Sequence, residues 1–202
     1  MKCRVLFGGV VLGLVACSDV EKDHAHDHEH EVITTVTLTL TPVSGGADQV
    51  FIWDDPEADG DPLVDVIVLS AGEDYGVTVA FINALESPPE DITDEVEDEG
   101  EEHQVFFTGS AVQGPATGEQ PDALVTHVYA DEDETGLPIG LSSTLETLVE
   151  GVGDLTVTLR HLPPESGAAV KQAGLAEQVA SEGFGAIGGD NDVQVSFGLE
   201  VE

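Results

Sequence analysis

The feature of this chain that most constrains its fold is an alternation of side chains with a period of two residues. Residues 32–41 read VITTVTLTLT, and residues 193–201 carry Val, Phe and Leu at every second position. Successive side chains of a β-strand point to opposite faces of a sheet, so this spacing predicts two half-buried strands. Further segments rich in β-branched or aromatic residues, and bounded by Gly, Pro or Asp, are also predicted strands: residues 50–53, 64–69, 77–83, 105–108, 124–130 and 155–161.

Two segments interrupt the strand pattern. Residues 86–102 contain ten carboxylates and no basic residue, and they fit either a loop or a short acidic helix. Residues 166–182 are rich in helix-forming Ala, Gln and Glu, which predicts one short helix. Because no long helix separates the strands, we expect an all-β fold over residues 32–202: a single antiparallel β-sandwich, immunoglobulin-like or related, with at most one short helix.

Charge is the second constraint. The chain has 41 Asp and Glu residues against five Lys and Arg residues, a net charge of −36, and no basic residue lies between Lys22 and Arg160. A field of this sign repels phosphate backbones, so we expect no nucleic-acid partner. The same field attracts cations, although an acidic surface also keeps a protein soluble and is compatible with a salty habitat.

The N-terminus resembles a bacterial lipoprotein signal. Lys2 and Arg4 are followed by an apolar run over residues 5–15, and Leu-Val-Ala stands directly before Cys17. The run is shorter than the about 20 apolar residues that span a bilayer. We therefore expect residues 1–16 to be a removed signal peptide and Cys17 to be lipidated, which predicts a cell-envelope protein anchored to a membrane. Ser18 after the cysteine is compatible with sorting to the outer membrane. The alternative is an ordinary secretory signal with an incidental cysteine.

Residues 17–31 are expected to form a flexible tether, because SDVEKDHAHDHEHE at 18–31 has no apolar periodicity. Histidines occupy every second position of this tract, interleaved with Ala, Asp and Glu: His24, His26, His28 and His30. Neutral imidazoles and carboxylates are good ligands for divalent transition metals, so the tract predicts metal binding, with zinc foremost. The alternatives are a solvated spacer and a tether that responds to pH.

Two histidines of the β domain are second candidates for metal ligands. His161 continues the inward-facing alternation of residues 155–159, which directs its ring toward the core or the rim of the sheet. His103 follows the acidic run, and Glu99 shares its face if this segment is helical. A hydrogen-bonded core histidine is the plainer interpretation of His161, and His127 offers a weaker signal still.

Carboxylates at short spacing also occur in residues 54–61 (DDPEADGD) and 131–136 (DEDETG). Calcium binds oxygens of this kind on tight loops. Neither segment has the full EF-hand spacing, and plain polar turns between strands, which need no metal, are the favoured interpretation of both.

No catalytic motif stands out in the sequence. The chain has no G-x-S-x-G elbow, no H-E-x-x-H pair and no P-loop. Residues 183–188 match G-x-G-x-x-G, but they precede a predicted strand instead of following one and opening a helix, so we interpret them as a glycine-rich loop. We therefore expect no enzymatic activity.

Five segments resemble a known group of proteins: EVITTVTLTLTP (31–42), DITDEVEDEGEEHQVFF (91–107), GLPIGL (136–141), LTVTLRHLP (155–163) and IGGDNDVQVSF (187–197). They are similar to uncharacterised lipoproteins of Bacteroidota and other marine bacteria, some of which carry automatic names that mention a type 1 periplasmic binding fold. That fold is a larger two-domain α/β structure, and this chain has neither its length nor its helices. The resemblance implies that His103 and His161 lie in marker motifs, and it suggests an outer-membrane setting beside a receptor that imports metal.

Two functional hypotheses follow from the sequence. The first is a membrane-anchored lipoprotein that binds or buffers a divalent transition metal through the His tract, with His103 and His161 as further candidates. The second is a structural or adhesive surface module that binds a protein or a glycan, in which the His tract is only a spacer. Phe51, Trp53 and Tyr75 are the aromatic residues available for such contacts, unless they belong to the core.

Overall fold

The computed structural model describes residues 31–202. The predicted signal peptide, Cys17 and the four histidines of the tract lie outside the described residues, and their roles stay predictions. Within the described range, no helix combines the length and the hydropathy needed to span a membrane.

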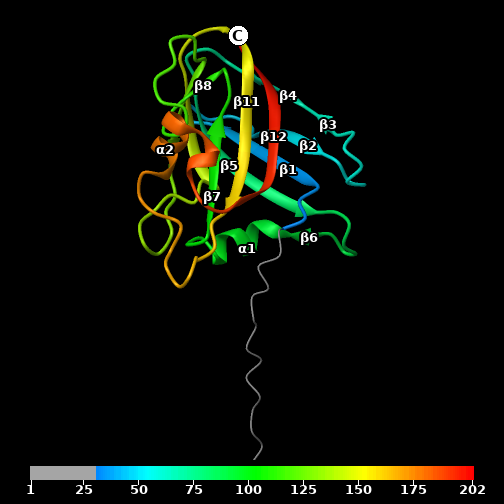
Figure 1. The fold of residues 1–202 in the computed structure, drawn as a ribbon. Coiled ribbons are helices and arrows are strands. Elements are labelled where there is room, and N and C mark those ends of the chain that lie inside the picture. Colours follow the sequence, from blue (N-terminus) through cyan, green and yellow to red (C-terminus); the bar gives the residue numbers. More distant parts are fainter. Residues whose placement is uncertain (1–30) are drawn as a thin grey trace, which may run out of the picture.

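The strands of residues 31–202 form two sheets that enclose a common core (Figure 1). The larger sheet has the order β3-β2-β1-β5-β10-β9-β8, and β6 pairs with β5. Its strands are β1 (Thr35–Pro42), β2 (Gln49–Asp54), β3 (Leu63–Val64), β5 (Asp74–Asn83), β6 (Glu90–Asp91), β8 (Val112–Gln113), β9 (Val125–Tyr129) and β10 (Ser142–Thr147). The smaller sheet has the order β4-β12-β11-β7, with β4 (Val66–Leu69), β7 (His103–Thr108), β11 (Gly151–His161) and β12 (Asp190–Val201).

The period-two alternation buries one face of each long strand. In β1, Val36, Leu38 and Leu40 are buried, while the intervening threonines are only partly covered. Both sheets contribute large side chains to the core, and burial of each such side chain stabilises the fold by roughly 1.5–3 kcal/mol. The bulkiest are Tyr75, Phe81, Phe107 and Phe197.

The prediction of a mainly β fold is confirmed, but two of its details are corrected. Two strand pairs, β4 with β12 and β8 with β9, are parallel, so the described sheets are mixed and not purely antiparallel. Two α-helices are present in residues 31–202 where at most one was expected: α1 (Ile92–Asp98) and α2 (Leu175–Glu182). A 3-10 turn, η1 (Phe184–Ala186), follows α2.

Residues 64–69, which the sequence predicts to be one strand, divide between the two sheets at Asp65. Val64 belongs to β3, and the residues after Asp65 form β4 of the smaller sheet. Asp65 bonds twice to Ile52: its backbone N–H donates to the Ile52 carbonyl at 3.0 Å, and its carboxylate accepts the Ile52 N–H at 2.9 Å. These bonds hold the chain at the edge of the larger sheet just before it crosses to the smaller one.

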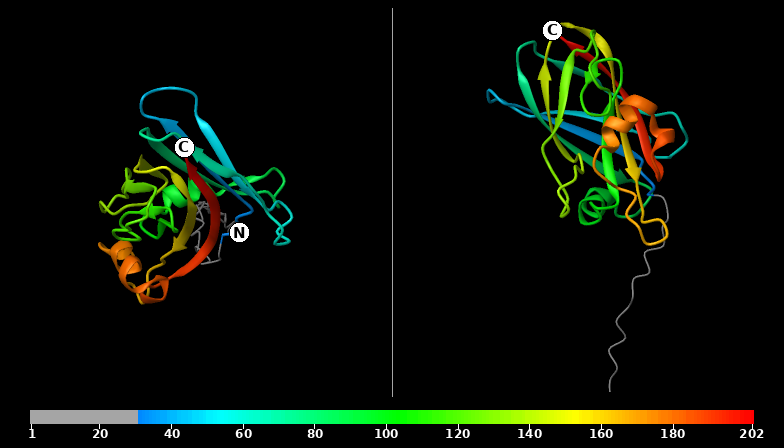
Figure 2. Two further views of the ribbon diagram at one scale, coloured as in Figure 1. Left: turned by 90° about the horizontal axis from the view of Figure 1, so that it is seen from above. Right: turned by 60° about the vertical axis from the view of Figure 1, so that its left-hand side comes forward.

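Helix α1 lies at the end of the molecule opposite the C-terminus (Figures 1 and 2). Asp91 directly precedes it, and the Asp91 side chain caps the helix by accepting the backbone N–H of Thr93 at 3.0 Å. Ile92 and Val96, four residues apart and therefore on one face, are buried and anchor it on the core. The carboxylates of its other faces remain at the surface, at the end where β7 begins and β11 ends.

Candidate metal site

The strand register brings His103 and His161 together. His103 is the first residue of β7, His161 is the last residue of β11, and the two are directly paired in this antiparallel ladder. Cross-strand partners project their side chains to the same face of a sheet. The two imidazole rings stack with their centroids 4.7 Å apart and their planes 10° from parallel.

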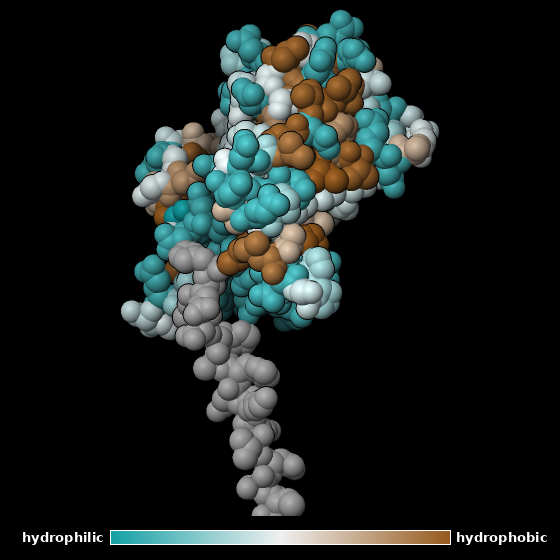
Figure 3. All heavy atoms as spheres, turned by 90° about the vertical axis from the view of Figure 1, so that its right-hand side faces the viewer, coloured by the Kyte–Doolittle hydropathy of each residue, from teal (hydrophilic) through white to brown (hydrophobic). Residues whose placement is uncertain are grey.

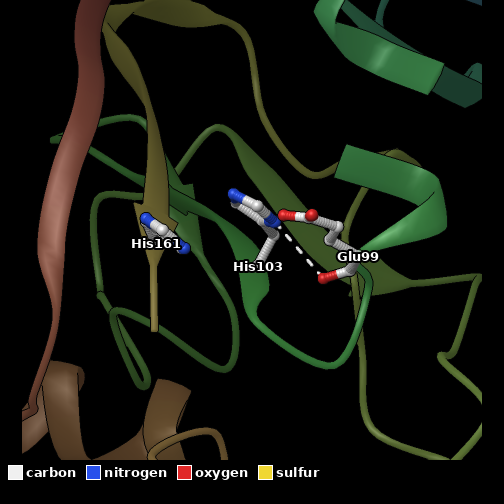
Figure 4. Close-up of side chains that lie close together, drawn as sticks. All are labelled: Glu99, His103 and His161. Carbon is white, nitrogen blue, oxygen red and sulfur yellow. Dashed lines mark hydrogen bonds between the residues drawn. The ribbon is translucent and has the colours of Figure 1, made fainter. Parts of the chain in front are cut away.

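Glu99 joins this pair from the end of α1 (Figure 4). It is the C-cap residue of the helix, and one ligand atom from each of Glu99, His103 and His161 lies within 4.8 Å of the others. The sequence singled out Glu99 and His103 together on the assumption of a helix. The structure brings them together differently, because the helix ends at Asp98 and the chain turns before His103.

His103 is held as a neutral, buried imidazole. Its side chain is 1% exposed, and its Nδ1 lies 3.2 Å from the backbone carbonyl of Glu99. A carbonyl oxygen only accepts, so Nδ1 carries the proton and Nε2 carries the lone pair. Burial, followed by repulsion from His161, lowers the pKa of His103 to about 4. Nε2 has no hydrogen-bond partner in the described chain.

His161 lies at the rim, where the site meets solvent. Its side chain is 11% exposed, and its Nε2 lies 3.7 Å from a carboxylate oxygen of Glu102. It therefore faces the outside while its ring covers His103.

The site opens into an acidic cleft of about 1290 Å³. Most of the residues that line it are Asp or Glu, including Glu99, Glu102 and five residues of the segment around α1, and none of the lining residues is Lys or Arg. Arg160 and Lys171 are the Lys and Arg residues of the described range, and both are buried. A cleft of one sign concentrates cations.

Glu31, the first described residue, also lines this cleft. Its burial, and then its repulsion by Glu95, Asp192, Glu90 and Glu99, raise the pKa of Glu31 to about 7. Carboxylates are therefore crowded here to the point that one of them holds a proton near neutral pH.

The three ligand atoms fit a divalent ion after a modest contraction. Zinc bonds of 2.0–2.1 Å in a tetrahedral arrangement place ligand atoms about 3.4 Å apart. The separations of up to 4.8 Å in the site need to shorten by roughly an ångström.

His127 is placed in the core and away from this cluster. Its Nε2 lies 3.0 Å from Ser143 Oγ, and its ring stacks on Phe107 with centroids 4.3 Å apart. The sequence likewise gave a weaker signal for His127 as a metal ligand than for His103 or His161.

The two acidic loops are built as polar turns. Asp55 accepts the backbone N–H groups of Asp59 and Gly60 at 3.1 and 3.0 Å. In the second loop both oxygens of Asp131 accept backbone N–H groups, and Asp133 Oδ2 lies 2.7 Å from Lys171 Nζ. These carboxylates already serve the local backbone or a buried cation, which favours the plain-turn interpretation over calcium binding.

Asp192 and Glu31 are the residues of this region that the sequence did not identify. Asp192 Oδ2 lies 3.9 Å from His103 Nε2, and its side chain is fully buried. The one signal for it was its position just before the alternation of residues 193–201, within the segment IGGDNDVQVSF that supports the family resemblance.

Comparison of the chain with protein-family models, with curated proteins and with solved structures finds no match in any of the three.

Proposed function

We propose that this chain is a membrane-anchored lipoprotein of the cell envelope that binds or buffers a divalent transition metal, foremost zinc, through Glu99, His103 and His161. The observation that carries the proposal is His103: its buried Nε2 has no hydrogen-bond partner, and the residue belongs to a cluster of ligand groups with Glu99 and His161. Leaving a buried polar atom unsatisfied costs about 1–3 kcal/mol, and a metal bond removes that penalty.

The chemistry of the ligands supports a borderline divalent ion. Imidazole nitrogens suit zinc, copper, iron and nickel, and carboxylates add charge to hold them. His103 donates its other ring nitrogen to a backbone carbonyl, which is the usual second contact of a metal-bound histidine. The position of His161 at the rim leaves the ion able to exchange, which suits buffering.

The His tract and the anchor complete the proposal. His30 directly precedes Glu31, so the four tract histidines are joined to the acidic cleft by covalent linkage. Lipidation of Cys17 would hold the domain at the outer membrane, where a receptor that imports metal is the partner that such a protein would serve. No catalytic step is part of this role.

Zinc titration by calorimetry tests the proposal. The soluble chain from Ser18 is compared with three variants: one with the tract histidines changed to Ser, one with His103→Gln and His161→Gln, and one with all six changes. We expect the first variant to keep tight binding and the second to lose the tight phase. His127→Gln, a buried histidine outside the cluster, is the matched control. Binding weaker than about millimolar in the unchanged protein, near −4 kcal/mol, would reject the metal role.

A surface module is the second candidate, and an exposed apolar surface favours it. Figure 3 shows apolar residues gathered on the side of the molecule that carries β2, β3 and β4. The exposed apolar residues of these strands are Val50, Ile52, Leu63, Val64, Val66 and Val68. The aromatic residues considered from the sequence do not form this surface: Tyr75 is buried, and Phe51 and Trp53 pack against the core.

The module hypothesis is tested by changing this surface without unfolding the sheet. Ile52→Thr and Val66→Thr keep residues that favour strands. If the surface binds a protein or glycan, cells that display the double variant should lose adhesion while their protein retains its zinc affinity. Equal adhesion of wild type and variant would exclude this surface as the contact.

A further inference from the structure

A buried amine and a buried carboxyl group meet outside the candidate metal site. Lys171 lies in the loop between β11 and α2, and its Nζ is 2.7 Å from Oδ2 of Asp133, in the loop between β9 and β10. Both side chains are 1% exposed. The carboxyl carbon of Asp133 is bonded to Oδ2 and so lies no more than about 4 Å from Nζ. Since reacting atoms approach to about 3–3.5 Å before a bond forms, this pair is close to reacting distance.

The other oxygen of Asp133 is held by three hydrogen-bond donors. Oδ1 accepts the backbone N–H of Thr135 at 2.8 Å, the hydroxyl of Thr135 at 2.6 Å and the backbone N–H of Leu137 at 3.0 Å. The backbone N–H of Asp133 donates to the Leu137 carbonyl at 2.8 Å and closes the loop around the carboxyl group. Donors fixed in this way stabilise the charge that develops on an oxygen when a nucleophile adds to its carbon. The loop therefore surrounds Oδ1 with an oxyanion hole and leaves Oδ2 facing the amine.

The surroundings of Lys171 favour a nucleophilic amine. Burial lowers the pKa of Lys171, and a bond from Nζ to the Gly100 carbonyl at 2.6 Å fixes the position of the nitrogen. Transfer of a proton from Nζ to Oδ2 gives a neutral amine and a neutral carboxyl group, which need less solvation than two buried charges.

The ion pair is nevertheless the main form before reaction. Burial raises the pKa of Asp133, but hydrogen bonds from Lys171, Thr135 and Leu137 outweigh it and lower the pKa to about 2. The neutral pair is therefore a minor species, and a reaction that proceeds through it is slow.

We propose that the side chains of Lys171 and Asp133 condense to an intramolecular isopeptide bond. After the proton transfer to Oδ2, the lone pair of Nζ attacks Cγ, and Oδ1 carries the negative charge within its three donors. A second proton then moves from the nitrogen to Oδ2, the bond between Cγ and Oδ2 breaks, and Oδ2 leaves as water. One ammonium and one carboxylate become one amide and one water molecule, so the step needs no oxidant, reductant or cofactor.

A cavity beside the pair gives the released water a place to go. Its volume is about 260 Å³, and Lys171, Thr135 and Leu137 are among the residues that line it. The new bond would tie the loop before α2 to the loop between two strands of the larger sheet. Residues 31–202 contain no cysteine, so no disulfide can serve as a cross-link within them. This cross-link is independent of the proposed metal site.

Mass spectrometry of the intact full chain tests the proposal. After prolonged incubation of the folded protein, we expect a mass below that calculated from the sequence by one water molecule. Lys171→Arg is the matched control, because it keeps a cation beside Asp133 but its guanidinium stays protonated and is not a nucleophile. The mass of this variant should equal the calculated value.

Tryptic digestion of the denatured proteins locates the bond. Beyond Lys22 the sequence offers trypsin only Arg160 and Lys171. An amide on Nζ blocks cleavage after Lys171, and it keeps residues 161–202 joined to the segment that carries Asp133 even after cleavage at Arg160. The wild type should therefore remain one species, whereas Lys171→Arg should release residues 172–202. A wild-type mass equal to the calculated value would overturn the proposal. Release of residues 172–202 from a wild type that has lost water would also overturn it, since the dehydration would then lie elsewhere.

Discussion

His103 and His161 lie opposite each other in the β7–β11 ladder, and their rings stack almost in parallel at the end of the molecule that carries α1. The pairing fixes which histidine is buried and which meets solvent. His103 is covered by its partner's ring and held by Glu99, whereas His161 lines the cleft. An ion entering from the acidic cleft therefore meets His161 first and His103 last.

Zinc should stabilise the folded domain through this pair. At a free zinc concentration 100 times the dissociation constant, linkage gives about 2.7 kcal/mol of stabilisation. For a domain of this size that corresponds to a rise of roughly 5–10 °C in thermal midpoint. Scanning calorimetry with and without zinc measures the shift, which should vanish in His103→Gln with His161→Gln and persist in His127→Gln. An equal shift in all three proteins would show that zinc acts elsewhere.

The strand alternation made both histidines predictable as candidates, but their juxtaposition was not predictable. The two-residue alternation predicted that His161 lies on an inward face, and the acidic residues before His103 made it a candidate ligand. Whether the two meet depends on the pairing of β7 with β11, strands separated by more than 40 residues of chain, and no local pattern encodes that register.

Other parts of the fold escaped prediction for equally physical reasons. Strand β10 was not predicted, because it has only one large apolar residue, Leu145, and its other inward residues, Ser143 and Thr147, are small and polar. Asp192, whose buried side chain lies beside His103, was missed because a bulge breaks the alternation at this residue. A carboxylate in a segment of regular alternation would have been assigned to one face or the other, but a bulged residue follows neither.

His127 should make the metal-free protein sensitive to mild acid. Burial lowers its pKa from 6.5 to about 4, so the unfolded chain takes up a proton at this residue before the folded chain does. The contribution of neutral His127 to the free energy of unfolding is complete above pH 6.5 and declines as the pH falls toward 4. The decline is about 2 kcal/mol between pH 7 and pH 5. Urea unfolding in the presence of a chelator should show that His127→Gln loses less stability over this interval than the wild type. Identical pH dependence in both proteins would contradict the assignment.

Gly189 should be intolerant of any side chain. Its φ is +73°, and a Cβ built on it would lie 2.0 Å from the backbone carbonyl oxygen of His161. Gly189→Ala therefore combines backbone strain with a contact that backbone movement alone can relieve, and we expect a loss of at least about 2 kcal/mol of stability. Because His161 has to shift, zinc affinity should also fall. Gly185→Ala is the control, since nothing lies within 4 Å of its added Cβ; equal stability of the two variants would refute the argument.

Lys171 should be essential to stability even though it lies outside the ligand cluster. Its ammonium group lies 2.7 Å from Asp133 Oδ2 and donates to the carbonyl of Gly100 at 2.6 Å, and both charged side chains are 1% exposed. It thus ties the loop before α2 to the turn after α1 and to the loop that carries Asp133.

Removal of Lys171 leaves the Asp133 carboxylate buried beside an acidic cleft. Burial raises the pKa of Asp133, but hydrogen bonds from Lys171, Thr135 and Leu137, together with the charge of Lys171, outweigh it and lower the pKa to about 2. Lys171→Met should therefore destabilise the domain by about 3–5 kcal/mol, the usual result of breaking one side of a buried pair. Urea unfolding of Lys171→Met, Asp133→Asn and the double variant measures the coupling. The Lys171 change should be much less damaging when residue 133 is neutral, whereas additive losses would mean that the ion pair itself contributes nothing.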